Sequence, residues 1–334
     1  MTTIRDVARR AGVAPSTVSY ALSGKRTISV KARGRIAKAI YELNFSPSEL
    51  GRRLAHSRSN TIGLVFPVSE AELAWETLDF VPTAAAALNK QGYGLSVFTG
   101  PMTPEQILKL YRENHVDGLI LMQICHQDAR VEILRGTGYP LVLIGRCANP
   151  QGLSLVDFDP EQAICTLFEH LVQLGHRHIG YLDLPQQKRK EKLGFARFVQ
   201  RGFVRAQKNF DVVTLKEEID GSIESGFRAT ANLLKREPRI SAFVTLHGST
   251  HTGVLRALRQ QDRRIPQDCS VIGISRLSWS QWSHPQLTST DIPLIEMVRT
   301  GAEMLLQQIA GTAIPRQVIF PAQLILREST AQKS

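Results

Sequence analysis

The 334-residue sequence lacks any run of apolar residues that approaches the roughly eighteen needed to cross a bilayer, which excludes a membrane-spanning helix. Its first ten residues contain no apolar segment like that of a signal peptide, so we expect a cytoplasmic protein. C-x-x-C pairs are absent, and the few cysteines are interpreted as reduced thiols, most of them in core strands and helices: Cys125, Cys147, Cys165 and Cys269. With 43% hydrophobic and 21% charged residues, the composition excludes a disordered or fibrous chain.

Acidic residues are scarce at the amino-terminal end. The first 60 residues contain twelve lysines and arginines but only three acids, Asp6, Glu42 and Glu49, so this segment carries a net charge of +9. The whole chain carries +11, which leaves only +2 for the other 274 residues. A basic head on a nearly neutral body indicates a head that binds a polyanion, because a merely solvated basic surface would spread its charge more evenly.

The basic segment has the pattern of three short helices. A first helix ends at a turn that contains Gly12, and Pro15 suits the first position of a second helix over residues 16–22. Ser29 is expected to cap a third helix that runs through Leu43. This order is typical of a helix-turn-helix, whose second helix enters the major groove of DNA; a small helical bundle without that role is the alternative. The polar residues expected on the outer face of the second helix are Ser16, Thr17, Ser19 and Tyr20.

A fourth, very short helix is predicted after the third. Residues 46–49 form a helix start signal, and the helix is expected to end near Ala55 after about two turns. Isolated helices need roughly 12–15 residues to be stable in water, so this segment should fold only against a partner. Leu54 follows Arg52 and Arg53, and a leucine beside basic residues suits a minor groove. A solvated linker is the alternative.

Residues 4–19, 30–43 and 44–55 carry a specific resemblance to a known family. In these segments the sequence resembles the LacI/GalR family of bacterial transcription regulators, and the spacing of later segments extends the resemblance over essentially the whole chain. The resemblance implies a homodimer that binds a palindromic double-stranded operator, with a core like that of periplasmic sugar-binding proteins. It also implies that a small-molecule effector in a cleft between two lobes controls DNA binding.

The resemblance also implies particular DNA contacts. Pro15, Ser16 and Tyr20 stand at base-reading positions, and Leu54 stands where the family's hinge leucine opens the centre of the operator. Two residues depart from the family pattern: Ala14 replaces the usual serine cap, and Tyr20 stands where many relatives have arginine. Tyrosine lacks the two-donor fork that reads guanine, so we expect a different operator base there. The complete set of candidate DNA contacts is Pro15, Ser16, Thr17, Ser19, Tyr20, Ser29, Arg52, Leu54 and Ala55.

From Thr61 onward, apolar strand-like runs alternate with helical stretches in two successive series. This pattern predicts an α/β fold: a small all-helical head, then a two-lobed core of parallel sheets flanked by helices. The resemblance to the LacI/GalR family implies that the chain crosses between the lobes near residues 158, 291 and 320. The predicted domains are residues 1–56 (helix-turn-helix about 4–23, hinge helix about 46–56), a linker at 57–60, and an effector-binding and dimerisation domain at 61–334. The predicted strands are 61–66, 94–98, 118–122 and 140–144, then 178–183, 212–215, 242–246 and 270–274.

The predicted cleft lacks most of the polar residues with which relatives bind sugars. Its candidate effector contacts are Ser69, Trp75, Met122, Arg146, Glu191, His247, Ser275 and Arg276. Arg146 and Arg276 should repel each other unless an anion lies between them, so an acidic or phosphorylated sugar is one candidate effector. A non-sugar metabolite and an empty cleft in a constitutive repressor are the other two.

No catalytic motif is evident. His247 and His251 lie four residues apart but lack the glutamate of H-E-x-x-H, and no phosphate-binding loop occurs. His176 and His178 are interpreted as helix-end capping and surface residues. We therefore expect no enzyme, no metal and no cofactor, but a sequence-specific DNA-binding regulator, most simply a repressor of a carbohydrate-related operon. A cytoplasmic solute-binding or enzyme-like protein with an incidental basic head is the alternative.

Overall fold

The computed structural model describes residues 3–23, 28–43, 58–67, 80–184, 193–246 and 248–333. The chain divides into two compact units, which are described separately. One comprises residues 1–61 with 109–117, and the other comprises residues 62–108 with 118–334. Among the described residues, no helix is long and apolar enough to cross a membrane.

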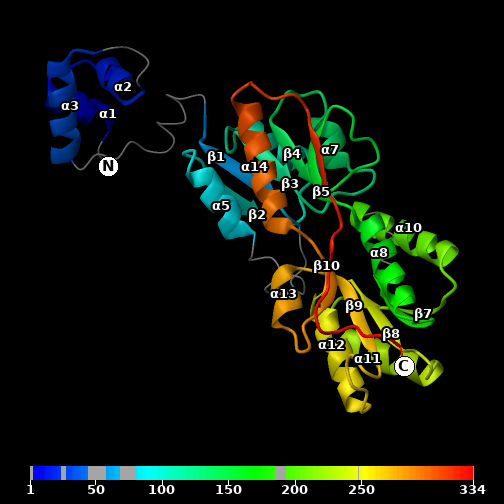
Figure 1. Cartoon of the computed structure of the whole chain (residues 1–334). Coiled ribbons are helices and arrows are strands. Elements are labelled where there is room, and N and C mark those ends of the chain that lie inside the picture. Colours follow the sequence, from blue (N-terminus) through cyan, green and yellow to red (C-terminus); the bar gives the residue numbers. More distant parts are fainter. Residues whose placement is uncertain are drawn as a thin grey trace. The chain divides into compact units, whose positions relative to one another are not determined.

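Three helices form the amino-terminal head: α1 (Ile4–Ala11), α2 (Pro15–Ser23) and α3 (Val30–Glu42) (Figure 1). They pack on one small apolar cluster whose buried members are Val7, Ala8, Ala11, Val18, Ile36 and Ala39. The predicted order of three short helices is therefore confirmed, and α2 is one residue longer at each end than predicted. The amino-terminal position of proline and the serine cap explain why α2 and α3 begin where they do.

The core holds two sheets, as the alternating pattern predicted, but each has six strands where the pattern predicted four. The first has the strand order β11-β5-β4-β3-β1-β2 and the second the order β12-β10-β9-β8-β6-β7. Every pairing described between strands is parallel except that of β10 with β12. The strands of the first sheet are β1 (Thr61–Val65), β2 (Gly94–Phe98), β3 (Gly118–Leu121), β4 (Leu141–Ile144), β5 (Ser154–Phe158) and β11 (Gln317–Phe320). Those of the second are β6 (His178–Asp183), β7 (Val213–Glu218), β8 (Ala242–Thr245), β9 (Ser270–Ser275), β10 (Thr288–Asp291) and β12 (Leu324–Ile325).

Each sheet with its helices is one lobe of the core, and the chain passes between the lobes three times. It leaves the first sheet after β5, returns after β10 through α14, and leaves again between β11 and β12. α14 packs against β3, β4 and β5 of the first sheet, beside which it lies in Figure 1. The three crossings predicted near residues 158, 291 and 320 are thereby confirmed. The helices of the first lobe are α5 (Val81–Asn89), α6 (Pro104–Arg112), α7 (Ala129–Leu134) and α14 (Leu294–Ile309).

Helices cover both faces of the second sheet. In β8, Ala242 and Val244 belong to the apolar cluster that includes α8 and α10, whereas Phe243 belongs to the cluster that includes α11 and α12. Because alternate residues of a strand point to opposite faces, the two helix pairs lie on opposite sides of the sheet. The helices of this lobe are α8 (Pro160–Gln173), α10 (Gly194–Asn209), α11 (Ile223–Arg236), α12 (Gly248–Gln260) and α13 (Leu277–Trp282).

Two sequence-based expectations need correction. The apolar pattern predicted four strands in each series, but it missed β5, β10 and β11, which contain polar or charged residues, and β12, which is only two residues long. His176 is not a surface residue: it is 2% exposed, and its Nδ1 lies 2.9 Å from Ser241 Oγ. Its Nε2 lies 2.9 Å from Ser270 Oγ and 3.1 Å from the Ala331 carbonyl oxygen. The ring is buried because three chain segments supply hydrogen-bond partners for it, and burial lowers its pKa.

Candidate functional site

The turn between α1 and α2 sets the position of the predicted recognition helix. Thr3 and Asp6 form a capping box at the start of α1, with Thr3 Oγ1 accepting from the Asp6 N–H at 3.4 Å. Gly12 ends α1 in the left-handed conformation, at φ 62°, which a residue with a Cβ adopts at a cost. The chain therefore reverses within three residues, and α2 starts at Pro15.

The described candidate DNA contacts all lie in the head. Pro15 and Ser16 are exposed at the start of α2, and the exposed Ser29 accepts the N–H of Ala32 as the cap of α3 at 3.2 Å. Thr17, Ser19 and Tyr20 are half-buried along α2, less exposed than the sequence pattern predicted, because Val18 on the same helix packs into the core of the head. The other three candidates, Arg52, Leu54 and Ala55, lie outside the described residues.

The head keeps an excess of positive charge at its surface. Of the two acids in its described part, Asp6 lies 3.7 Å from Arg9, and Glu42 lies 2.5 Å from Arg10. The same part contains five further cations, namely Arg5, Lys31, Arg33, Arg35 and Lys38, all exposed. Since salt screens such charges only beyond about 8 Å at physiological ionic strength, they create a positive field that attracts phosphate groups at close range.

Four candidate effector contacts lie in the described core, and each follows the carboxyl end of a parallel strand. Met122 follows β3, Arg146 follows β4, Ser275 ends β9 and Arg276 caps α13. Ligands of open α/β sheets bind beyond this edge. The other four candidates, Ser69, Trp75, Glu191 and His247, lie outside the described residues.

Arg146 is already engaged by protein groups. Its Nε donates to Asp157 Oδ2 at 2.7 Å, and its Nη2 donates to the Phe158 carbonyl oxygen at 3.3 Å. The Asp157 side chain is 12% exposed, and burial raises its pKa to about 6 although Arg146 opposes the rise. The expected repulsion between Arg146 and Arg276 therefore needs correction, because Asp157 supplies a negative charge that sequence reasoning did not count.

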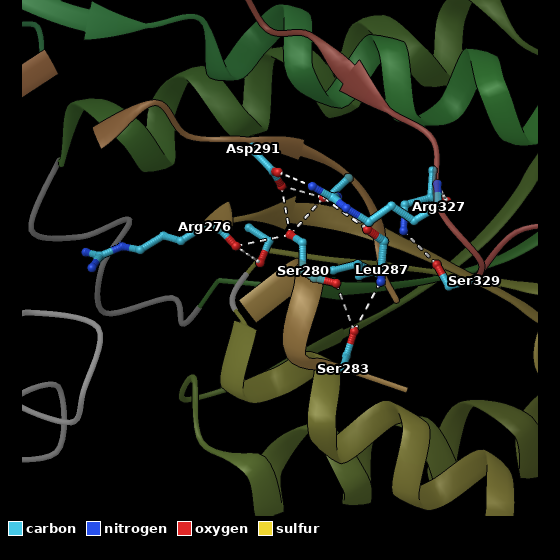
Figure 2. A network of polar contacts seen from close by, with 10 residues as sticks. Arg276, Ser280, Ser283, Leu287, Asp291, Arg327 and Ser329 are labelled. Atoms are coloured by element: carbon cyan, nitrogen blue, oxygen red, sulfur yellow. Dashed lines mark hydrogen bonds and ion pairs between the residues drawn. The ribbon is translucent and has the colours of Figure 1, made fainter. Parts of the chain in front are cut away.

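Arg276 borders a buried polar network in the second lobe. Its backbone carbonyl oxygen lies 3.1 Å from Ser280 Oγ, while its side chain extends away from Asp291 (Figure 2). Ser280 Oγ donates to Asp291 Oδ1 at 2.7 Å. Asp291 Oδ2 lies 2.5 Å from Arg327 Nη2, and the two side chains are 8% and 7% exposed. The network holds the start of α13 in place. Because Arg276 is the N-cap of this helix, the network also fixes the backbone from which its side chain extends.

A separate hollow of about 560 Å³ contains none of the candidate effector contacts. It lies at the end of α12 and is lined by Arg259, Asp262, Arg263, Arg264, Ile265, His284 and Pro285. Within the described ranges, no three histidine, cysteine, aspartate or glutamate side chains are grouped so that they could hold a metal ion.

Sequence reasoning missed three partners of the candidate site: Asp157, Arg327, and Phe198, whose ring centre lies 4.0 Å from the guanidinium carbon of Arg146. Asp157 gave the clearest signal, since an acid inside the run Leu155-Val156-Asp157-Phe158 requires a partner when the strand is buried. Phe198 and Arg327 gave none, because an aromatic residue in a helix and an arginine near the end of a chain are ordinary surface or core residues until their neighbours are known.

Comparisons with known proteins agree with this architecture. Residues 3–48 match the family model "Bacterial regulatory proteins, lacI family", and residues 168–330 match "Periplasmic binding protein-like domain". The HTH-type transcriptional repressor PurR of Erwinia tasmaniensis is 30% identical, with 99% of this chain and 97% of that protein covered.

Two solved structures are also similar over nearly the whole chain. The lac repressor dimer bound to operator and the anti-inducer ONPF is 25% identical, with 99% of each chain covered and a TM-score of 0.82. The complex of the transcriptional regulator CelR with cellobiose is 27% identical, with 98% of this chain and 100% of that chain covered and a TM-score of 0.70. With a helix-turn-helix head and a two-lobed core both matched, the protein belongs to the lacI family of bacterial regulatory proteins and is a DNA-binding transcription regulator.

Proposed function

We propose that this regulator is a homodimeric repressor that binds a palindromic operator. The observation that carries the proposal is the placement of α2 directly after the Gly12 turn, with Pro15 and Ser16 exposed on a basic head. A two-helix motif of this kind reads one half-site, and a symmetric dimer reads two half-sites about one helical turn apart. The similarity to a lac repressor dimer on its operator supports the same arrangement.

The proposed domain boundaries follow the sequence pattern. Residues 1–56 would form the DNA-binding domain with its hinge helix, residues 57–60 the linker, and residues 61–334 the effector-binding and dimerisation domain. The candidate DNA contacts would divide between α2, the cap of α3 and the hinge. We propose no catalytic role for this chain, in keeping with a family of transcription regulators.

Selection of duplexes from a randomised pool, followed by gel shift, tests the proposed function. The full-length protein should enrich one palindromic sequence and bind it at least about a thousandfold more tightly than random DNA at physiological salt. Equal affinity for selected and random duplexes would contradict sequence-specific recognition. Enrichment of a single half-site without symmetry would contradict the homodimer.

A first prediction concerns Leu54, which we propose as a wedge in the minor groove. Leu54→Ala should weaken binding to the selected duplex by about 2 kcal/mol, the scale of unstacking one base step and losing the compensating contacts. Binding to random DNA should barely change, because Arg52 and Arg53 remain to contact phosphates. Fluorescence titration of both duplexes measures the two affinities, and an equal loss on each would contradict the wedge.

A second prediction concerns the base read by Tyr20. Tyr20→Arg should shift the preferred base toward guanine at one symmetric pair of operator positions, because arginine adds a bidentate contact worth about 1–3 kcal/mol. Repeating the duplex selection with this variant measures the preference at every position. Tyr20→Phe is the matched control, since it keeps the ring but adds no donor. An unchanged profile for Tyr20→Arg would show that the residue does not face the bases.

We further propose a small-molecule effector, most simply carbohydrate-related, between the lobes. The complex of the similar regulator CelR with cellobiose supports a sugar, and the position of Met122, Ser275 and Arg276 at strand ends supports the site. Asp157 already pairs with Arg146, and we propose that Arg276, at the start of α13, is the cation that contacts an acidic sugar. A non-sugar metabolite and the absence of any effector are the competing proposals.

A third prediction tests the acidic-sugar proposal by thermal shift. Acidic members of matched pairs, such as glucose 6-phosphate against glucose and cellobionic acid against cellobiose, should raise the Tm more than their neutral parents do. A ligand at a hundredfold excess over its Kd stabilises the folded state by about 2.7 kcal/mol. Arg276→Ala should remove most of the gain, whereas Arg239→Ala, an exposed arginine that pairs with Glu237, should not. Greater stabilisation by the neutral members would contradict the role of Arg276.

A further inference from the structure

Arg146 belongs to the first lobe, yet its side chain contacts the second lobe. Arg146 follows β4 of the first sheet, and its guanidinium carbon lies 4.0 Å from the centre of the Phe198 ring on α10. The side chain is only 20% exposed, so the charge on the ring face is partly removed from water, where a cation–π contact is stronger than at an exposed site.

The first lobe holds the guanidinium in a defined orientation. Asp157 at the end of β5 accepts from Nε at 2.7 Å, the Phe158 carbonyl accepts from Nη2 at 3.3 Å, and Asp159 Oδ1 lies 3.9 Å from Nη2. These partners lie along the edge of the planar group and leave its face for Phe198. A lysine could keep the charge, but its compact ammonium offers neither the planar fork nor the stacking face.

A backbone contact stands beside Arg146 and joins the same lobes. The Gly194 N–H, at the start of α10, donates to the Ile124 carbonyl oxygen at 2.8 Å as part of an isolated antiparallel bridge between Leu193 and Cys125. A Cβ on Gly194 would lie 2.4 Å from the Arg146 carbonyl oxygen, so the backbones approach too closely for any side chain there. The lobes are therefore in direct contact at a seam formed by residues 124–125, 146 and 193–198.

We propose that Arg146 is an interlobe clasp: a positioning residue that Asp157 fixes to the first lobe and that holds α10 of the second lobe through Phe198. In this role Arg146 is not a ligand of the effector, although it stands at a candidate effector position. Any rotation of the lobes that separates Phe198 from Arg146 exposes the guanidinium face and breaks the Gly194 hydrogen bond. The clasp thus biases the lobes toward the arrangement in the structure; its bearing on operator binding rests on the proposed function.

A second arginine provides a matched control on the same ring. The Arg201 guanidinium carbon lies 5.7 Å from the Phe198 centroid, but Arg201 belongs to α10 itself and pairs with Glu161 of α8 at 3.0 Å, all within the second lobe. Arg201→Lys removes an arginine near the Phe198 ring without changing the contact between the lobes. Arg146→Lys removes the arginine whose contact with Phe198 joins the two lobes.

Hydrogen–deuterium exchange of the full-length protein, without ligand or DNA, tests the clasp through the Gly194 amide. Arg146→Lys and Phe198→Leu should each raise exchange in a peptide covering residues 193–198 by about fivefold, the change in opening equilibrium that an ordinary cation–π contact provides. In both variants, exchange in β3 and β8, which lie inside the two lobes, should stay as in the wild type. The control variant Arg201→Lys should show wild-type exchange in every peptide.

Three results would overturn the clasp. They are unchanged exchange at residues 193–198 in Arg146→Lys, an equal rise in Arg201→Lys, and a rise of the same size in β3 and β8, which would indicate general destabilisation. The outcome does not depend on operator binding. Failure of the wild type to select a duplex would therefore overturn the proposed function and leave the clasp standing.

Discussion

Arg327→Met should lower the free energy of unfolding of the protein by about 3–5 kcal/mol, because it leaves the buried carboxylate of Asp291 without its counter-ion. Arg327 Nη2 lies 2.5 Å from Asp291 Oδ2, and Nη1 donates to Ser289 Oγ at 2.8 Å and to the Leu287 carbonyl at 2.7 Å. Methionine fills a similar volume but offers none of these donors (Figure 2). Urea unfolding at pH 7 measures the loss.

The size of this effect follows from where the pair lies. Asp291 ends β10 just before the chain returns to the first lobe, and Arg327 follows β12 just after the chain has come back. The pair therefore reinforces the pairing of β10 with β12, which closes the loop that contains α14 and β11. Ser280 and Ser289 each donate to Asp291 Oδ1, so the carboxylate would stay partly satisfied but uncompensated in charge.

Two further variants separate charge from packing. Arg327→Met combined with Asp291→Asn should recover roughly half of the loss, because it removes the unpaired charge. Arg264→Met is the matched control: Arg264 Nε lies 2.7 Å from Asp268 Oδ2, but the two side chains are 73% and 28% exposed, so this substitution should cost far less than Arg327→Met. A loss of equal size in Arg327→Met and Arg264→Met would show that burial of the pair contributes nothing.

Local signals made the head and the order of elements predictable. A serine before α3, a proline at the start of α2 and a glycine after α1 act within one turn of the chain, so their effect can be inferred from neighbouring residues. Alternation of apolar runs with helices likewise predicted the two lobes. In both cases the residues that decide the structure lie close together in the sequence.

Long-range partners made the remainder unpredictable. β10 reads Thr-Ser-Thr-Asp, which has no apolar pattern, yet residues 288–290 are fully buried. They are accommodated because Ser329 accepts the Thr288 N–H at 2.8 Å and Arg327 donates to Ser289, from a segment about forty residues away. The position of Arg146 after β4 was predictable, because it depends on neighbouring residues in the sequence. Its partners Asp157 and Phe198 come from other elements, and they show that Arg146 contacts protein groups.

His251 should make the protein sensitive to acid. It lies in the first turn of α12, is 1% exposed, and neither ring nitrogen has a hydrogen-bond partner among the residues that the structure describes. Burial is the main cause that lowers its pKa from 6.5 to about 3, and the nearby Arg259 adds to the shift. The positive end of the α12 dipole opposes a charged ring as well. The folded protein therefore keeps His251 neutral at pH values where an unfolded chain protonates it.

Between pH 7 and pH 4 this difference should cost the wild type about 3 kcal/mol of unfolding free energy. The unfolded state binds the extra proton below pH 6.5, so stability rises with pH through this window and falls as pH approaches 3. His251→Gln cannot take up this proton. Between pH 7 and pH 4 its unfolding free energy should therefore fall by about 3 kcal/mol less than that of the wild type. His176, which burial shifts in the same direction, is present in both proteins and cancels.

His115→Gln is the control for the substitution itself, since the His115 side chain is 49% exposed beside Glu113. Urea unfolding of the three proteins at several pH values between 7 and 4 gives the comparison. The slope of stability against pH should flatten for His251→Gln alone. Parallel curves for the wild type and His251→Gln would mean that the ring gains a partner or a proton in the folded state, and that His251 is not held neutral. A flattening of the same size in His115→Gln would trace the acid sensitivity to loss of any histidine, and would contradict burial as its cause.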